Sequence, residues 1–292
     1  MIEKFLQYLQ YEKNYSSHTV LSYKNDLLQF SQFCKMQENE NDISQAKADG
    51  IRSWIIELIS NGLTPRSANR KLSSLKSFYK FLIHEGVIKL NPARNILSPK
   101  TNKPLPLFFK EKEIDAVIHD VILGDAFEDV RDRLIISLFY ETGIRISELV
   151  AIKDVDIDIH TNSLKVLGKR NKERKIPIGK ELLSQVGEYI KLRNEMLKKD
   201  SVYLLVKNNG DKLYARLVYS IVNKYMSMVS SLSKTSPHVL RHTFASTLLN
   251  NGADLNAVKE LLGHANLSAT EVYTHTSFEQ LHKIYKQAHP RA

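Results

Sequence analysis

The segment 98–106 constrains the fold of this chain more than any other feature. It contains Pro99, Pro104 and Pro106 and shows no apolar periodicity, which is typical of an extended linker. The parts before and after it are each long enough to bury a hydrophobic core. We therefore predict a domain at 1–97, a linker at 98–106 and a second domain at 107–292.

The first part has the pattern of a small helical bundle. Apolar residues recur at helical spacing in four stretches of 1–97, joined by short connections. Ser17 is the expected N-cap of the second helix. Thr64 and Pro65 open the fourth, with proline at the first helical position, where its missing N–H costs nothing.

The second part mixes helices with a small sheet. Helical patterns cover about 111–122 and 126–141, and a short helix follows at 144–149. Alternation of apolar and polar residues within 155–178, with two turns, predicts about three antiparallel strands. Further helices begin at Ser236-Pro237, at Asp254, and at the capping boxes of Ser268 and Ser277. The predicted fold is mainly α, with a helical bundle followed by a mixed α+β domain.

Charge and composition indicate a partner class and a compartment. The net charge of +10 is shared about equally by both parts, which suits a clamp on a polyanion, although a merely basic soluble protein has the same balance. Cys34 is the single cysteine, so no intramolecular disulfide forms. No apolar run reaches the roughly 20 residues of a membrane span, and the first residues lack a signal-peptide pattern. We expect a cytoplasmic protein that does not enter a membrane.

Three basic segments are candidate DNA contacts. The fourth helix has one face with basic and short polar residues and no acidic residue before Glu85, unlike an ordinary solvated face. The lysines of the linker form the second basic segment, and a basic turn near residue 170 forms the third. The predicted contact residues are Arg66, Asn69, Arg70, Lys76, Lys80, Lys100, Lys103, Arg170, Lys172 and Arg174.

The chemistry is concentrated around Ser236–His242. His238 and Arg241 are three residues apart and therefore share one helix face. This places a proton carrier beside a planar cation that suits two phosphate oxygens. Arg145 is a second candidate phosphate ligand, and Tyr273 supplies a hydroxyl able to attack a phosphodiester once a base activates it.

Each of these residues also has an ordinary structural interpretation. Arg145 is positioned to pair with Glu148 on its own helix, and Lys169 resembles a solvated turn lysine. His238 and His242 have the spacing of two metal ligands, but no third ligand, HExxH motif or cysteine pair accompanies them. We therefore expect neither a metal nor a cofactor, with arginines stabilising the phosphate charge.

Five motifs in order carry a family resemblance. They are Thr142-Gly143-Ile144-Arg145-Ile146-Ser147-Glu148-Leu149, Gly168-Lys169-Arg170-Asn171-Lys172-Glu173-Arg174, His238-Val239-Leu240-Arg241, Leu262-Gly263-His264 and Tyr273-Thr274-His275. Over essentially its whole length the chain resembles the tyrosine recombinase (phage integrase) family. It is most similar to the Xer branch, whose chains commonly end as His289-Pro290-Arg291-Ala292 does here.

The resemblance implies a mechanism and a site. It implies an N-terminal SAM-like core-binding domain that clamps DNA and a C-terminal catalytic domain. Tyr273 would form a 3′-phosphotyrosyl link and release a 5′ hydroxyl without metal or ATP. Lys169 would protonate the leaving oxygen, His238 would act as base, and His264 would support the phosphate. The implied catalytic residues are Arg145, Lys169, His238, Arg241, His264 and Tyr273.

The resemblance also implies partners and a biological role. The expected partners are a double-stranded DNA recombination site and three further protomers, of this chain or a paralogue, with a cell-division DNA translocase as activator. The last helix would be donated to a neighbouring protomer, or else pack on its own domain. The expected role is resolution of chromosome and plasmid dimers at cell division. The alternatives are an integrase of a mobile element, a type IB topoisomerase, and a DNA-binding protein that has lost catalysis.

Overall fold

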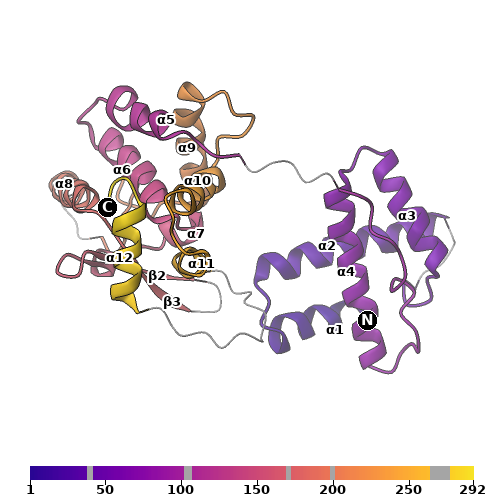
Figure 1. Ribbon diagram of the computed structural model, residues 1–292. Coiled ribbons are helices and arrows are strands. Elements are labelled where there is room, and N and C mark those ends of the chain that lie inside the picture. The colour runs from indigo at the N-terminus through magenta and orange to yellow at the C-terminus, as the bar shows by residue number, and fades with distance from the viewer. Residues whose placement is uncertain (38–41, 102–106, 169–171, 198–200, 264–276) are drawn as a thin grey trace. The chain divides into compact units, whose positions relative to one another are not determined.

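A computed structural model describes residues 1–37, 42–101, 107–168, 172–197, 201–263 and 277–292. The chain divides into two compact units, Met1–Pro104 and Leu105–Ala292, each with its own hydrophobic core. Figure 1 shows the helices and strands of each unit, and each is considered by itself. No helix within these ranges is both long and apolar enough to cross a bilayer.

The first unit is a four-helix bundle. Its helices are α1 (Ile2–Gln7), continued by the π-helical turn η1 (Tyr8–Glu12), α2 (Ser17–Gln37), α3 (Ala48–Ser60) and α4 (Pro65–His84). Phe5, Trp54 and Phe78 are among the buried residues that fill its core. The fold prediction for this part is confirmed.

Two helix starts in this unit test the capping arguments. Pro65 is the first residue of α4, and the Thr64 hydroxyl accepts a hydrogen bond from the Ser67 amide at 3.3 Å. For α2 the predicted cap is wrong by one position. Ser17 is already helical, and the hydroxyl of Ser16 accepts from the Thr19 amide at 3.3 Å. Adjacent serines are chemically equal candidates, so sequence alone does not separate them.

The second unit is built around α6 (Phe127–Thr142), whose residues are nearly all buried. Helices α8 (Lys180–Leu197), α9 (Ala215–Val229) and α10 (Pro237–Asn250) pack against it. The remaining elements are α5 (Glu111–Ala116) with its π-helical extension η2 (Val117–Val121), α7 (Ile146–Leu149), η3 (Asp154–Asp156), α11 (Leu255–Leu262) and α12 (Phe278–Ala288). A helix as deeply buried as α6 requires cover on every side, and α8, α9, α10 and η2 contact it.

The sheet has three antiparallel strands in the order β1 (Ile157–Asp158), β2 (Ser163–Leu167) and β3 (Glu173–Pro177). Leu164 pairs with Ile176, and both are buried on the face toward the core. Lys165 pairs with Lys175 on the opposite face, as the two-residue strand period requires. The predicted small sheet is confirmed, and its β2–β3 turn carries the basic segment.

The last helix packs on its own unit in this single-chain structure. Leu281, Tyr285 and Ala288 of α12 are buried, and the helix lies against β3, α10 and α11. Its start has the predicted capping box, in which Ser277 and Gln280 exchange hydrogen bonds at 3.1 and 3.2 Å. The predicted capping box at Ser268 lies outside the described residues.

Candidate active site

Arg145 is placed by a tight turn after α6. Gly143 ends that helix with a left-handed φ of 57°, and a Cβ there would lie 2.9 Å from Cγ of Phe244. Glycine therefore satisfies both the backbone conformation and the close approach. The turn makes Arg145 the N-cap of α7, half-buried at the surface of the unit.

The carboxylate of Glu148 holds Arg145 in place. Its Oε2 accepts from the Arg145 amide at 2.8 Å, and its Oε1 accepts from Nη1 of Arg145 at 2.9 Å. Arg174 of β3 donates to the same two oxygens at 2.9 and 2.8 Å. Burial alone would raise the pKa of Glu148, but the hydrogen bonds from Arg174 and Arg145 hold it below its ordinary value. The group is therefore an anion at neutral pH, and the ion pair considered for Arg145 exists.

Arg241 comes from the first turns of α10, next to the same turn. Its Nη1 donates to the Gly143 carbonyl at 2.5 Å and its Nη2 to the Leu262 carbonyl at 2.6 Å. Burial, followed by the nearby charge of Arg145, lowers the pKa of Arg241 to about 10. It still carries its charge at neutral pH, so the positively charged guanidinium groups of Arg145 and Arg241 lie close together.

The C-terminal end of α11 collects three arginines. Its last carbonyls have no helical partner, and the helix dipole makes this end negative. Arg174 donates to Leu261 at 2.7 Å, Arg241 to Leu262 at 2.6 Å and Arg145 to Gly263 at 3.1 Å. Three consecutive carbonyls therefore fix three cations that would otherwise repel one another.

His238 lies in the first turn of α10, and Pro237 is the first helical residue, as predicted. Ser236 occupies the N-cap position, but its side chain makes no capping hydrogen bond. The imidazole of His238 is exposed. Partial burial, then the neighbouring His242 and the positive charges of Arg241 and Arg145, lower the pKa of His238. It is therefore neutral at pH 7 and able to accept a proton.

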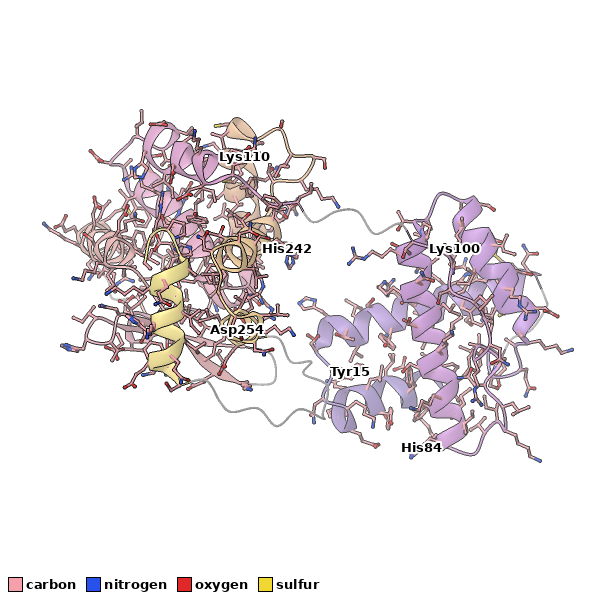
Figure 2. The ribbon with its side chains drawn as sticks, in the orientation of Figure 1. Tyr15, His84, Lys100, Lys110, His242 and Asp254 are labelled. Carbon is pink, nitrogen blue, oxygen red and sulfur yellow. The ribbon has the colours of Figure 1, made fainter. Side chains whose placement is uncertain are left out.

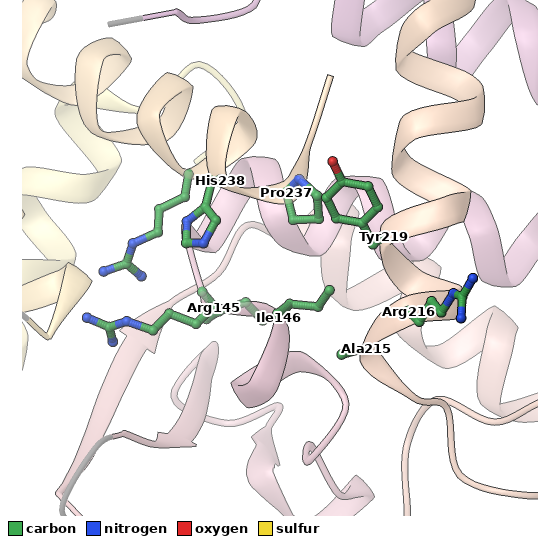
Figure 3. A pocket seen from close by; sticks show the side chains of 9 residues that line it. Arg145, Ile146, Ala215, Arg216, Tyr219, Pro237 and His238 are labelled. Carbon is green, nitrogen blue, oxygen red and sulfur yellow. The ribbon is translucent and has the colours of Figure 1, made fainter. Parts of the chain in front are cut away.

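These groups line one pocket of about 350 Å³. Figure 3 shows His238 and Arg145 at one side of it and Tyr219 and Arg216 of α9 at the other. The lining residues are Ile144, Arg145, Ile146, Ala215, Arg216, Tyr219, Pro237, His238 and Arg241. Arg145, His238 and Arg241, which are far apart in sequence, thus converge on a single cavity.

Sequence reasoning missed Arg216 and Tyr219. One signal was present, because Arg216 stands in the first turn of α9, where the helix dipole disfavours a cation. A cation in that position is unfavourable for the helix itself, which marks Arg216 as unusual. No comparable signal marks Tyr219, since most tyrosines are packing residues.

Three predicted catalytic residues, Lys169, His264 and Tyr273, lie outside the described residues. In the sequence, Lys169 follows Gly168 between β2 and β3, and His264 directly follows Gly263, the residue after α11. Tyr273 belongs to the chain between α11 and α12.

The predicted DNA contacts of α4 divide into two groups. Arg66 and Lys80 are exposed. Asn69 donates to the Pro99 carbonyl at 2.8 Å, and Lys76 donates to the Ile96 carbonyl at 3.0 Å. These two bonds tie the helix to the segment that precedes the second unit.

Arg70 is both exposed and paired. Its Nη2 donates to the buried carboxylate of Asp26 at 2.7 Å, and Lys71 donates to the same group at 2.9 Å. Of the remaining candidates, Lys100 and Lys172 are exposed, and Lys103 and Arg170 lie outside the described residues. The predicted DNA contacts stay predictions.

The metal interpretation of His238 and His242 gains no third ligand from the part of the chain that the structure describes. Within the described ranges no three or more His, Cys, Asp or Glu side chains are grouped to hold a metal ion. Figure 2 shows His242 projecting from the surface of its unit.

Comparisons with known proteins cover the whole chain. The profile of the "Phage integrase family" matches residues 108–280, and that of the "Phage integrase, N-terminal SAM-like domain" matches residues 2–86. The chain is 41% identical to tyrosine recombinase XerC of Staphylococcus saprophyticus over 290 residues, 99% of this chain and 97% of the relative. It is 40% identical to tyrosine recombinase XerC of Staphylococcus aureus, covering 99% and 96%.

Solved structures share the fold. The Tn1549 transposon integrase in complex with transposon right end DNA superposes with a TM-score of 0.74 at 22% identity, covering 98% of each chain. The XerH site-specific recombinase bound to its difH substrate gives a TM-score of 0.70 at 21% identity, covering 97% of this chain and 83% of that one.

Proposed function

The chain belongs to the phage integrase family of tyrosine recombinases, which are DNA strand-transferring enzymes, and from that premise we propose its mechanism and role. It cuts and rejoins a specific DNA site through a covalent 3′-phosphotyrosyl intermediate, resolving chromosome and plasmid dimers at cell division. The convergence of Arg145, Arg241 and His238 on one pocket carries the mechanistic part. Identity of 40–41% to XerC recombinases over nearly the full chain supports the role.

In the proposed mechanism Arg145 and Arg241 bind the non-bridging oxygens of the scissile phosphate. Both guanidinium groups are preoriented by protein acceptors, so little reorganisation is required when charge develops in the transition state. Loss of one such donor typically costs about 10²–10³-fold in rate. The two arginines thereby do the work that metal ions do in many other phosphoryl-transfer enzymes.

Tyr273 is the proposed nucleophile. Its oxygen bonds to phosphorus as the bond from phosphorus to the 5′ oxygen breaks, and Lys169 gives that oxygen a proton. His238, neutral because its pKa is lowered, accepts the tyrosine proton. His264 supports the phosphate. The ester conserves the energy of the phosphodiester, so the 5′ hydroxyl of another strand reverses the step without ATP.

The proposed partners follow from the family. The substrate is a duplex recombination site, clamped by domains 1–97 and 107–292 and reached by the exposed cations Arg66, Lys80, Lys100 and Lys172. Four protomers, of this chain or with a paralogue, form the synaptic complex, and a DNA translocase activates it. We place this reaction in the cytoplasm.

A suicide substrate tests the nucleophile directly. Tyr273→Phe removes the hydroxyl, so we expect normal DNA binding and no covalent adduct on a nicked site. Tyr11→Phe is the matched control, because Tyr11 is 72% exposed in the first unit and is expected to retain the adduct. Cleavage is also expected to persist in excess EDTA. An adduct formed by Tyr273→Phe, or loss of cleavage with EDTA, would contradict the proposal.

A further inference from the structure

Arg174 differs from the other arginines of the site in how its guanidinium is used. All three of its nitrogens donate inward, Nε to the Leu261 carbonyl and both Nη atoms to Glu148. Its side chain is 11% exposed, against 32% for Arg145. Nε of Arg145 and Nε of Arg241 make no hydrogen bond to any described residue. Arg145 and Arg241 therefore keep donors for a ligand, whereas Arg174 is committed to the protein.

The surroundings of Arg174 are closely fitted to it. A Cβ on Gly263 would lie 3.0 Å from its Nη1 and 3.2 Å from its Cδ, which is tighter than ordinary packing. Gly263 also has a φ of 64°, a conformation that favours glycine. Only a residue without a side chain brings the end of α11 this close to the guanidinium.

Arg174 is also the link between two separate parts of the site. Through Glu148 it acts on Arg145, at the start of α7. Through the Leu261 carbonyl it holds the end of α11, where Arg145 and Arg241 each find a further acceptor. No other described side chain bonds both to Glu148 and to the end of α11 except Arg145 itself.

We propose that Arg174 is a positioning residue for strand cleavage, which sets the orientation of Arg145 by sharing the Glu148 carboxylate with it. This inference rests on the proposed function, because it takes Arg145 as a ligand of the scissile phosphate. Without Arg174, Glu148 is free to draw the guanidinium of Arg145 into a two-pronged pair. Arg145, which should bind the scissile phosphate, is then held by Glu148 instead.

The test separates DNA binding from cleavage. We expect Arg174→Met to slow single-turnover cleavage of a nicked suicide substrate about 10–100-fold at saturating DNA, as loss of outer-shell partners does at metal sites. The dissociation constant is expected to stay within about twofold, with an unchanged salt dependence, because all three guanidinium nitrogens of Arg174 are already bonded within the protein.

Arg133→Met is the matched control. Arg133 also donates to backbone carbonyls, those of Ile122 and Gly124, but makes no contact with Glu148. This substitution is expected to lower the melting temperature and leave the cleavage rate of the folded protein unchanged. A purely structural role for Arg174 would make the two variants behave alike, which would overturn the proposal.

A double-mutant cycle supplies the second readout. If Arg174 acts through Glu148, Arg174→Met adds less than about threefold to the loss caused by Glu148→Gln. If the rate losses of the two single variants instead multiply in the double variant, Arg174 and Glu148 act independently, which would contradict the proposal. So would a salt slope lower by about one, the signature of a lost phosphate contact.

Two further variants keep the outcome interpretable. Should Arg174→Met fail to fold, Arg174→Lys retains the charge but not the forked geometry, and a similar rate loss is expected. Wild-type cleavage by Arg174→Lys would refute a geometric role. Arg145→Ala distinguishes the two proposals, because full cleavage by that variant refutes the assigned phosphate site itself, whatever Arg174 does.

Discussion

Glu141 and Glu148 lie on either side of Gly143 and are both buried, yet their environments are opposite. Glu148 accepts four hydrogen bonds from two arginines, and these keep its pKa below the ordinary value. Glu141 is fully buried, and neither of its oxygens has a hydrogen-bond partner in the described part of the chain. Burial raises the pKa of Glu141 to about 8, only partly offset by the charge of Arg291.

The contrast teaches that donors, more than depth, decide the charge of a buried carboxyl group. Glu148 is an anion that orients cations. Glu141 is largely protonated at neutral pH and lies under the C-terminal segment, with Tyr285 and Arg291 close by. Glu148 thus orients arginines at the pocket, whereas Glu141 is part of the buried core beneath the C-terminal segment.

The largest effect is expected from the substitution Glu148→Gln, which should lower the rate of DNA cleavage. The amide keeps the shape but removes the charge and turns one acceptor into a donor facing two arginines. We expect single-turnover cleavage to fall by about 10²-fold or more, consistent with the loss of one transition-state donor. Under the same assay Glu141→Gln should cleave at the wild-type rate. Equal losses of cleavage rate in the two variants would show that Glu148 and Glu141 do not differ in their effect on the reaction.

The next effect is on stability, and there the order of the two glutamates reverses. Because the pKa of Glu141 is raised from 4.5 to about 8 on folding, its contribution to stability is complete below pH 4.5 and is lost as pH rises toward 8. Glu141→Gln removes this loss. We expect the variant to be more stable than wild type by about 2 kcal/mol at pH 8, after allowing for a buried unpaired amide.

The pH dependence of that difference is its check. Chemical unfolding at pH 5 and pH 8 should show the gain at pH 8 and none at pH 5. A gain that is independent of pH would mean that Glu141 is not protonated in the folded protein.

A moderate effect is expected on the pH profile of cleavage. The pKa of His238 is lowered from 6.5, and the proposed mechanism needs its neutral form, so the midpoint of the pH–rate profile should lie below pH 6.5. Glu148, with its lowered pKa, should still be ionised there. Single-turnover rates at saturating DNA measure this. A midpoint above 6.5 would contradict the environment described for His238.

The smallest effect concerns Arg291, the cation whose charge acts on the pKa of Glu141. Its Nη2 is hydrogen-bonded to Asp115, a half-exposed side chain at 44%. Exposed pairs of this kind contribute about 0–1 kcal/mol, so Asp115→Asn should change the melting temperature only slightly. A large loss would show that this pair, and not the burial of Tyr285 and Leu281, holds the C-terminal segment in place.

Local patterns predicted most of the fold. The proline at Pro65, the capping residues Asp254 and Ser277, and the alternation around Leu164 each depend on near neighbours in sequence, and the structure has the expected elements there. Ser17 was misplaced by one residue because its neighbour is also a serine.

Tertiary partners were beyond reach of the sequence. The sequence predicts Arg174 and Arg70 as DNA contacts, but it does not show that each also bonds to a buried carboxylate from a distant segment. Charge is visible in a sequence, while the acceptor across the core is not. The burial of Glu141 was equally hidden, since it depends on residues more than a hundred positions further along the chain.

The helix end that receives Arg174, Arg241 and Arg145 through three successive carbonyls has a mechanical consequence. Neighbouring peptide units of one helix move together, so any small displacement of α11 carries all three guanidinium groups with it. Their mutual spacing therefore depends on one helix end that all three share. In the proposed mechanism, the scissile phosphate therefore meets guanidinium groups whose spacing is set by consecutive carbonyls of a single helix.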